Sequence, residues 1–244
     1  MANGRAAARD RTGGRVARLA FAGIPLGVAG CAGPYSTLDP VGPAAASIAA
    51  LWWGMFVVSV LVLAGVTALW LYAIKRDPGD VGADAAQRVQ NRWVIGGGIA
   101  LPAVCITALL AFGIPVGHSL LPAGDEPALR IEIIGHQWWW EVHYPDAGIT
   151  LVDEVHIPVG QSVDFHITSD DVIHSFWVPR LGGKLDAIPG RVNVLRLQTD
   201  APGEYRGQCA EFCGLLHARM GFTLEAHAPE DFDTWLAAQA DDDD

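Results

Sequence analysis

The chain has 244 residues, of which 51% are hydrophobic and only 18% are charged. That charged fraction lies below the ~25% of ordinary soluble domains, and residues 40–74 and 93–124 contain no Asp, Glu, Lys or Arg. These two stretches exclude a simple soluble protein. The polar, strand-like remainder of the chain excludes a polytopic transporter.

The two halves of the chain carry opposite charge. Residues 1–124 hold nine Lys or Arg and five Asp or Glu, a net of +4, whereas residues 125–244 hold seven and twenty-two, a net of −15. An acidic surface repels the phosphates of nucleic acid and attracts basic proteins. We therefore predict that the second half binds no nucleic acid and faces a basic partner, unless its charge serves solubility alone.

The N-terminus is typical of a targeting segment. Five arginines precede a short apolar stretch, residues 19–30, which ends at Cys31; such an apolar region is too short to span a membrane. The small residues before Cys31 resemble a bacterial lipoprotein signal. We predict a lipoprotein-type signal at residues 1–30 and lipidation of Cys31, with an ordinary signal and an unmodified cysteine as the alternative.

Two hydrophobic segments follow, and each exceeds the roughly 20 residues that a membrane-spanning helix needs. The loop between them begins with Lys75 and Arg76, whereas residues 32–49 hold no Lys or Arg. By the positive-inside rule this loop is cytoplasmic, and the rest of the chain lies outside the cytoplasm. In chain order we predict an exported segment at 31–48, a transmembrane helix at 49–74, a cytoplasmic loop at 75–92 and a second transmembrane helix at 93–121.

Beyond the second helix the pattern changes to that of short strands. Apolar and polar residues alternate in several segments that are separated by Gly, Pro and Asp clusters, as in an antiparallel sandwich or barrel. Residues 229–239 predict a helix with an acidic first turn. We predict an exported domain at 122–240 and an acidic tail at 241–244. The expected strands cover 130–134, 155–159, 163–167, 192–197 and 221–224.

Potential metal ligands are concentrated in one short segment. Two cysteines, a histidine and a methionine fall within twelve residues, and a second histidine stands earlier in the chain. Thiolate, thioether and imidazole ligands favour copper, but a single blue-copper ion uses only one cysteine. Two cysteines four residues apart can each bridge two copper ions, so that each ion keeps one imidazole and one weak axial ligand. We predict a dinuclear copper centre held by His174, Cys209, Cys213, His217, Met220 and a main-chain carbonyl such as that of Glu211.

Other interpretations of these residues remain open. Paired cysteines in an exported domain usually form a disulfide, and two Cys with two His can bind zinc, although zinc would leave Met220 without a role. The chain has no Cys-x-x-Cys-His motif, so no covalently bound c-type haem is expected. Four other histidines have no metal-like neighbour at short spacing and are expected to be hydrogen-bonded strand residues: His136, His143, His156 and His166.

Several motifs together resemble one known family. The Cys-x-Glu-x-Cys-x3-His-x2-Met loop, the run Gly-His-Gln-Trp-Trp-Trp at 135–140 and the segments 171–175 and 184–191 are similar to subunit II of bacterial haem–copper cytochrome c oxidases, across about residues 47–236. The resemblance implies a membrane helical hairpin that carries an all-β, cupredoxin-like Greek-key sandwich. It also implies a dinuclear copper centre, CuA, at the six positions named above.

The resemblance also implies roles for residues outside the copper loop. Trp138 matches the tryptophan on which cytochrome c docks, and is the expected electron entrance; alternation along a strand would place Trp138 and Trp140 on one face. Glu211 and Asp186 match neighbours of a magnesium ion at the boundary with subunit I. Rim charges tune association with a partner, and the acidic candidates are Glu141, Asp146, Asp153, Asp170 and Asp171.

The function implied is that of the electron-accepting subunit of a respiratory oxidase in the bacterial inner membrane, with its C-terminal domain on the periplasmic side. Electrons would pass from cytochrome c to copper and then to haem, which is expected only in subunit I, where oxygen becomes water and protons are translocated. Subunit III and membrane lipid are further expected partners. The alternatives are a membrane-tethered copper-delivery protein and a copper domain related to nitrous oxide reductase.

One position departs from the family pattern. Gln90 stands where many members carry a Glu at the mouth of a proton pathway. An amide cannot take up a proton at neutral pH, so proton uptake would have to use another group or a route within subunit I.

Overall fold

The computed structural model describes residues 32–77, 79, 82–122 and 128–241. The signal segment at 1–30, the lipidation of Cys31 and residues 242–244 of the acidic tail lie outside the described residues. They remain predictions.

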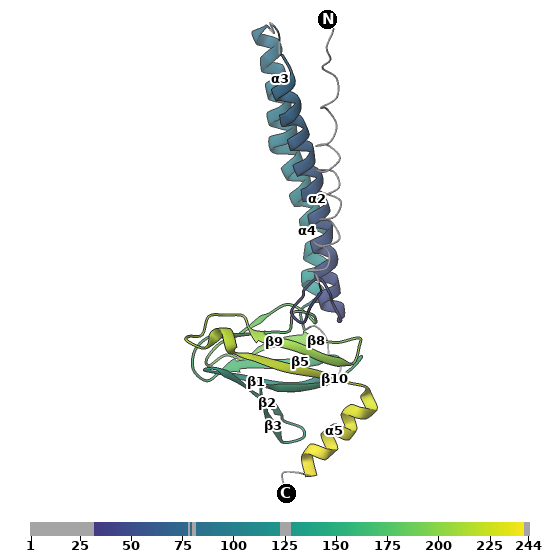
Figure 1. The fold of residues 1–244 in the computed structure, drawn as a ribbon, viewed down its shortest axis with the longest axis vertical. Coiled ribbons are helices and arrows are strands. Elements are labelled where there is room, and N and C mark those ends of the chain that lie inside the picture. Colours follow the sequence, from purple (N-terminus) through teal and green to yellow (C-terminus); the bar gives the residue numbers. More distant parts are fainter. Residues whose placement is uncertain (1–31, 78, 80–81, 123–127, 242–244) are drawn as a thin grey trace, which may run out of the picture.

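A long helical hairpin forms one end of the molecule (Figure 1). Its first arm is α2 (Pro43–Lys75), and its second arm runs without a break through α3 (Ala83–Ile95), the π-helical turn η2 (Gly96–Ala100) and α4 (Leu101–Ser119). Both arms are long and apolar enough to cross a membrane, and their most apolar stretches bury no side chains inside the structure. These apolar surfaces must be covered by lipid or by another chain, because water solvates them poorly.

Both arms extend beyond the predicted spans. The first begins at Pro43 rather than at residue 49, and proline is well suited to the first turn of a helix. The second begins at Ala83 rather than at residue 93, so that Gln90 lies on α3 instead of in a loop. Hydropathy marks the part of a helix that lipid surrounds, whereas the backbone continues to coil through polar residues that favour helix.

Residues 129–227 contain two five-stranded sheets. One has the order β3-β2-β1-β5-β8 and the other β4-β10-β9-β6-β7. The predicted fold class, a helical hairpin with a cupredoxin-like sandwich, is confirmed. The strands are β1 (Leu129–His136), β2 (Trp139–Tyr144), β3 (Ile149–Val152), β4 (Glu154–Pro158), β5 (Val163–Ser169), β6 (His174–Trp177), β7 (Leu185–Ala187), β8 (Asn193–Leu197), β9 (Gly203–Cys209) and β10 (Gly221–His227).

The expected sandwich is present, but its sheets are mixed and not antiparallel throughout. Strand β1 pairs with β5 in parallel, and β10 pairs with β4 in parallel, while the other ladders are antiparallel. Each parallel pair joins strands that are distant in sequence, and such a crossover cannot be recognised from the alternation within a single strand. The alternation itself was correct, because Ile131 and Ile133 of β1 and Phe165 of β5 point into a fully buried core.

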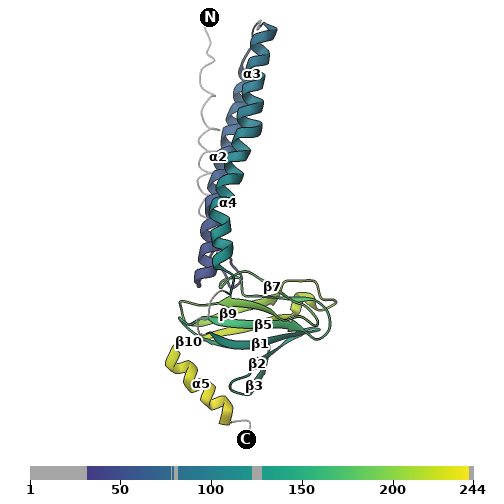
Figure 2. The ribbon, with the colours of Figure 1, turned by 180° about the vertical axis from the view of Figure 1, so that it is seen from behind.

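The C-terminal helix α5 (Pro229–Asp241) lies on the side of the sandwich away from the hairpin (Figure 2). It confirms the helix expected at residues 229–239. Its side chain Phe232 is buried, and Trp235 packs against the same core. The domain therefore carries the helical hairpin on one side and α5 on the other (Figure 2).

Candidate metal centre

The loop between β9 and β10 carries most of the predicted ligands, and two backbone contacts fix its ends. The N–H of Cys209 donates to the carbonyl of Met220 at 2.8 Å, so the loop closes on itself. The N–H of Ala210 donates to the carbonyl of Ser175 at 2.9 Å. Because Ser175 follows His174 in β6, this second bond brings the remote histidine to the loop.

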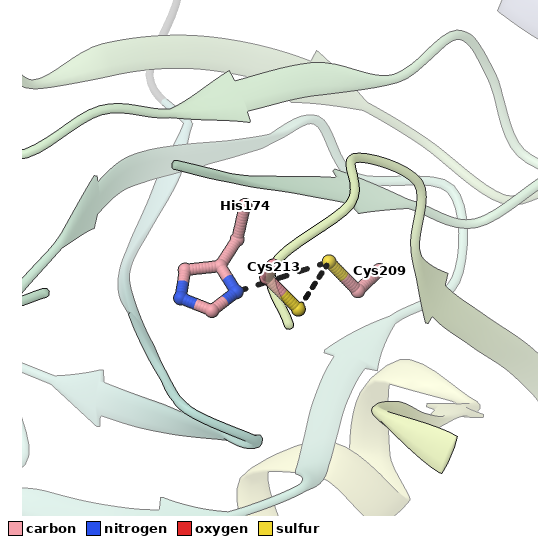
Figure 3. A group of neighbouring side chains, drawn as sticks. All are labelled: His174, Cys209 and Cys213. Carbon is pink, nitrogen blue, oxygen red and sulfur yellow. Dashed lines mark hydrogen bonds between the residues drawn. The ribbon is translucent and has the colours of Figure 1, made fainter. Parts of the chain in front are cut away.

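The two sulfurs and the remote imidazole point towards one another (Figure 3). The Sγ atoms of Cys209 and Cys213 are 3.8 Å apart, and Nδ1 of His174 lies 3.8 Å from the Sγ of Cys209. All three side chains are buried. A disulfide requires a sulfur–sulfur distance of about 2.05 Å, so the pair is not bonded here and both cysteines are free.

The other predicted ligands complete the cluster. Nδ1 of His217 lies 3.5 Å from the Sγ of Cys213, and the Met220 sulfur lies 3.7 Å from the same atom. The main-chain carbonyl of Glu211 accepts a hydrogen bond from the Cys209 thiol at 3.2 Å. Each cysteine thus has one imidazole and one weaker donor beside it.

A carboxylate holds the His174 ring in place. The Nε2–H of His174 donates to Asp171 at 2.8 Å, which leaves Nδ1 with a lone pair on the side of the sulfurs. Such an outer carboxylate orients a metal-binding histidine and fixes its tautomer. Burial alone would raise the pKa of Asp171, but hydrogen bonds from His174 and from the N–H groups of Val172 and Gln137 outweigh it and hold the pKa below its usual value.

Close packing also fixes the position of His174. A Cβ at Gly135 would lie 2.8 Å from the His174 ring, so only glycine fits opposite this side chain. On another side, the ring of Trp140 is 5.8 Å from that of His174 in an edge-on arrangement. The imidazole therefore has little room to turn.

The Cys213 thiol holds its proton when no metal is bound. Burial, with a further contribution from neighbouring Cys209, raises the pKa of the Cys213 thiol to about 12. A metal ion binds the thiolate, so it must expel this proton. Two cysteine sulfurs, two imidazoles, a thioether and a carbonyl gather in one cluster, in which both sulfurs of the cysteines, the thioether and the His174 ring are buried. This ligand set fits copper, and zinc would need neither the thioether nor the carbonyl.

Trp138 lies beside the centre, but not as the sequence suggested. It occupies the turn between β1 and β2 instead of sharing a strand face with Trp140. A Cβ on Gly214 would meet the Trp138 indole at 3.3 Å, so this ring lies directly on the copper loop. The side-chain amide of Gln137 donates to the carbonyl of Cys213 at 2.7 Å and ties the turn to the loop.

The other two tryptophans of the run have separate roles. Trp140 is fully buried and packs edge-on against Phe176 and Phe222 in the core. Trp139 stacks on His136 with ring centroids 4.2 Å apart. The turn thus leaves Trp138 as the member of the run that contacts the metal loop.

The predicted magnesium ligands are not brought into one group. Among the described residues, the side-chain clusters that could hold a metal include neither Glu211 nor Asp186. The Glu211 carboxylate is 3.7 Å from the Lys184 ammonium, and Asp186 lies on β7.

Two of the acidic docking candidates are engaged within the fold. Asp171 accepts from His174, and Asp153 accepts from the N–H of Trp140 at 2.7 Å. Asp146 and Asp170 are exposed, and Glu141 is half-buried near His136.

A second group of possible metal ligands was missed. His156 lies with its Nδ1 only 2.7 Å from Nε2 of His227, and Glu225 completes the group. His156 is a hydrogen-bonded strand residue, as expected, but its possible co-ligands His227 and Glu225 come from a strand that is distant in the sequence. The spacing of residues along the sequence could not reveal this group, because the parallel pairing of β10 with β4 brings together residues that are distant in the chain.

The chain is similar to known proteins, including in the domain that carries these potential ligands. Residues 148–227 match the family model described as cytochrome c oxidase subunit II, periplasmic domain. The chain is 34% identical to cytochrome c oxidase subunit 2 of Alkalihalophilus pseudofirmus, an alignment that covers 93% of this chain and 68% of that protein. It is 44% identical to the corresponding protein of Thermostichus vulcanus, over 53% of this chain and 40% of that protein.

A solved structure is also similar. The periplasmic domain of subunit II of the cytochrome oxidase of Bradyrhizobium japonicum aligns with a TM-score of 0.47 and 30% identity, over 50% of this chain and 99% of that domain. Given the extent and identity of the match to the Alkalihalophilus protein, the chain belongs to the cytochrome c oxidase subunit II family.

Proposed function

We propose that the chain accepts electrons from cytochrome c at a dinuclear copper centre and passes them to haem in subunit I, where oxygen is reduced to water and protons are translocated. The observation that carries the proposal is the pair of sulfurs 3.8 Å apart, each with its own imidazole. Family membership does not favour the copper-delivery protein or the copper domain of a nitrous oxide reductase.

The residues around the centre keep the ligands still. When bound, two bridged copper ions would supply a one-electron carrier whose charge is shared between both metals. Asp171 fixes the His174 ring, and the backbone bond between Cys209 and Met220 closes the loop. A ligand set that moves little between redox states needs little reorganisation, so electron transfer can be fast at a modest driving force.

Trp138 provides the route by which an electron reaches the loop. Its indole is half-buried and packs against Gly214, the residue that follows Cys213. A docked cytochrome would thus be separated from the ligands by one aromatic ring and one turn of backbone. The exposed carboxylates of Asp146 and Asp170 are the acidic groups best placed to attract a basic partner.

The two long helices support a location in the bacterial inner membrane, with the sandwich on the periplasmic side. Their exposed apolar faces suit lipid together with subunit I and subunit III. A signal segment at residues 1–30 and a lipid on Cys31 would be consistent with that location.

A magnesium ion would require ligands from the partner subunit. Glu211 is exposed, and its carboxylate lies 3.7 Å from the Lys184 ammonium, so it remains accessible at the surface of the copper loop. Glu211→Gln should lower the divalent metal content of the assembled oxidase and leave the copper content unchanged. Equal magnesium in both assemblies would remove Glu211 from that role.

Electron paramagnetic resonance of the copper-loaded full chain tests the central proposal. One unpaired electron shared equally by two copper nuclei gives a seven-line hyperfine pattern, and elemental analysis should find two copper ions per chain. A four-line pattern with one copper, or zinc in place of copper, would contradict the proposal.

Replacement of the proposed electron entrance provides a second test. Trp138→Phe should slow oxidation of cytochrome c by about tenfold or more, a barrier increase of ~1.4 kcal/mol, and leave the copper spectrum unchanged. Trp139→Phe is the matched control, because its ring stacks on His136 instead of on the copper loop. Equal turnover in both variants would exclude the role of Trp138.

A further inference from the structure

The cluster at His156 is assembled from two strands and lies away from the copper loop. In the parallel ladder between β4 and β10, Glu225 lies opposite His156, and His227 lies opposite Pro158. Nδ1 of His156 is 2.7 Å from Nε2 of His227 and 3.8 Å from a carboxylate oxygen of Glu225. Two imidazole nitrogens and a carboxylate therefore converge on one point.

A fourth side chain fixes which nitrogen of His156 is free. Glu154 lies 3.0 Å from Nε2 of His156 and can only accept, so this nitrogen carries the proton. Nδ1 then presents its lone pair to His227 and Glu225. A carboxylate that receives the far N–H of an imidazole is the usual outer partner of a metal-binding histidine, and Asp171 holds His174 in the same way.

The His156 ring is also held rigidly by its surroundings. The Tyr144 hydroxyl accepts from the backbone N–H of His156 at 2.7 Å and donates to its carbonyl at 2.8 Å. On the other side Trp235 of α5 stacks on the ring with centroids 4.1 Å apart. His156 is 4% exposed, whereas His227 is half-buried and Glu225 is exposed. One ligand is thus fixed in advance, and two can adjust from the solvent side.

We propose that His156, His227 and Glu225 form a second metal site, for zinc or another divalent transition-metal ion, with Glu154 as its orienting carboxylate. Two His and one Glu with a free fourth position form a recurrent zinc ligand set. Tetrahedral zinc at ~2.05 Å from each nitrogen would separate the two nitrogens by about 3.3 Å. The half-buried His227 needs to move by only about 0.6 Å from its hydrogen-bonded position to reach that separation.

The proposed site is chemically distinct from the copper centre. It contains no sulfur, so it lacks the soft ligands that favour Cu(I). It also lies at the far end of β10, whose first residue follows Met220 and whose last residue is His227. Its metal would join β4 and β10 beneath α5, on the side of the domain away from the hairpin (Figure 1). The inference does not depend on the proposed electron transfer.

Zinc binding to the copper-loaded full chain, prepared without a polyhistidine tag, tests this site. Equilibrium dialysis over a series of zinc concentrations, followed by elemental analysis, should show one zinc per chain. His227→Asn should weaken binding by at least tenfold, and Glu225→Gln should weaken it less. His143→Asn is the matched control, because that ring contacts Thr150 and belongs to no potential metal group among the described residues.

A further variant separates a metal site from a structural contact. Glu154→Gln removes no ligand, but it should weaken zinc binding by about 10- to 100-fold because the orienting carboxylate is lost. The copper resonance should stay the same in every variant, which keeps this test independent of the copper proposal. Equal zinc binding in the wild type and His227→Asn, or no zinc bound to the wild type, would overturn the site and leave His156 and His227 as a hydrogen-bonded pair.

Discussion

The two ligand clusters of the sandwich differ in chemistry and in burial. The copper cluster is rich in sulfur, and His174, Cys209 and Cys213 are all buried. The cluster at His156 has imidazoles and carboxylates, and only one of its three potential ligands is buried. A dry, preorganised site suits a permanently held redox metal, whereas a site with exposed ligands suits an ion that exchanges with solvent.

The comparison also shows how differently the two clusters are built. In the copper cluster a single loop supplies most ligands, and its ends are closed by the backbone bond from Cys209 to Met220. In the other cluster a strand pairing and the ring of Trp235 position the ligands. The first should therefore be sensitive to changes in the loop, and the second to changes in the docking of α5.

Removal of a bridging sulfur should have the largest effect. Cys209→Ser should abolish the dinuclear copper signal and oxidase activity, because a hydroxyl does not replace a thiolate that bridges two ions. Zinc binding at His156 should not change. Paramagnetic resonance with copper analysis, an assay of cytochrome c oxidation by the assembled oxidase, and zinc dialysis measure these three quantities.

The control for this variant is Cys105→Ser, since Cys105 lies in α4 within the hairpin. It should leave copper and activity intact. Survival of the two-copper signal in Cys209→Ser would show that the sulfur is not a bridge.

Truncation of the α5 aromatic ring should affect only the other cluster. Trp235→Ala removes a ring that stacks on His156 and packs against Tyr144, and should lower the free energy of unfolding by about 2 kcal/mol. It should also weaken zinc binding without altering the copper spectrum. Denaturant unfolding in detergent measures the change in the free energy of unfolding, and zinc dialysis measures the change in binding. A changed copper spectrum would mean that the two clusters are coupled.

Replacement of the thioether should have a smaller effect. Met220→Leu keeps the shape of a buried side chain that is 2% exposed, so its cost in stability should be about 1 kcal/mol or less. Loss of a weak axial donor should raise the redox potential and leave both copper ions bound. Spectroelectrochemical titration measures the shift. Loss of copper would show that Met220 is a strong ligand.

The smallest effect is expected between the clusters, at Asp153. Burial raises the pKa of this carboxyl, against a lowering hydrogen bond from the N–H of Trp140. The folded state therefore holds the proton more tightly than the unfolded state. Above the raised pKa, the ionised carboxylate slightly lowers the free energy of unfolding. Asp153→Asn keeps the acceptor and suits the positive φ of 57°.

At pH 7 the Asp153→Asn variant should be more stable by about 0.5 kcal/mol or less, and the gain should shrink as the pH falls through the raised pKa of folded Asp153 and vanish below the pKa of an unfolded Asp. Unfolding curves at pH 7 and at a pH below the pKa of an unfolded Asp measure this gain in stability. Both metal sites should be unaffected. Lower stability at pH 7 would mean that the negative charge itself is useful there.

The sequence predicted what is local and missed what depends on strand pairing. The ligand-rich loop between β9 and β10 was found because its potential ligands are close in the chain and have an unusual combination of donor types. Strands such as β1 and β5 were found from their alternation, but β2 was not, because its run of aromatic residues hides the alternation. The two-residue turn at Gln137 and Trp138 is local, but the aromatic run hides where β1 ends and β2 begins. The contact of His156 with His227 depends on how distant strands pair, and no local pattern contains that information.

The length of strand β10 has a consequence for the electrostatics of the domain. Its seven residues span about 20 Å between the two clusters. At that separation a divalent ion and a single electron interact by only about 0.4 kcal/mol in a dielectric of ~80, or about 1.7 kcal/mol at ~20. Physiological salt reduces this further, because its Debye length is about 8 Å. One end of the sandwich can therefore take up or release a cation with little effect on the driving force for electron transfer at the other.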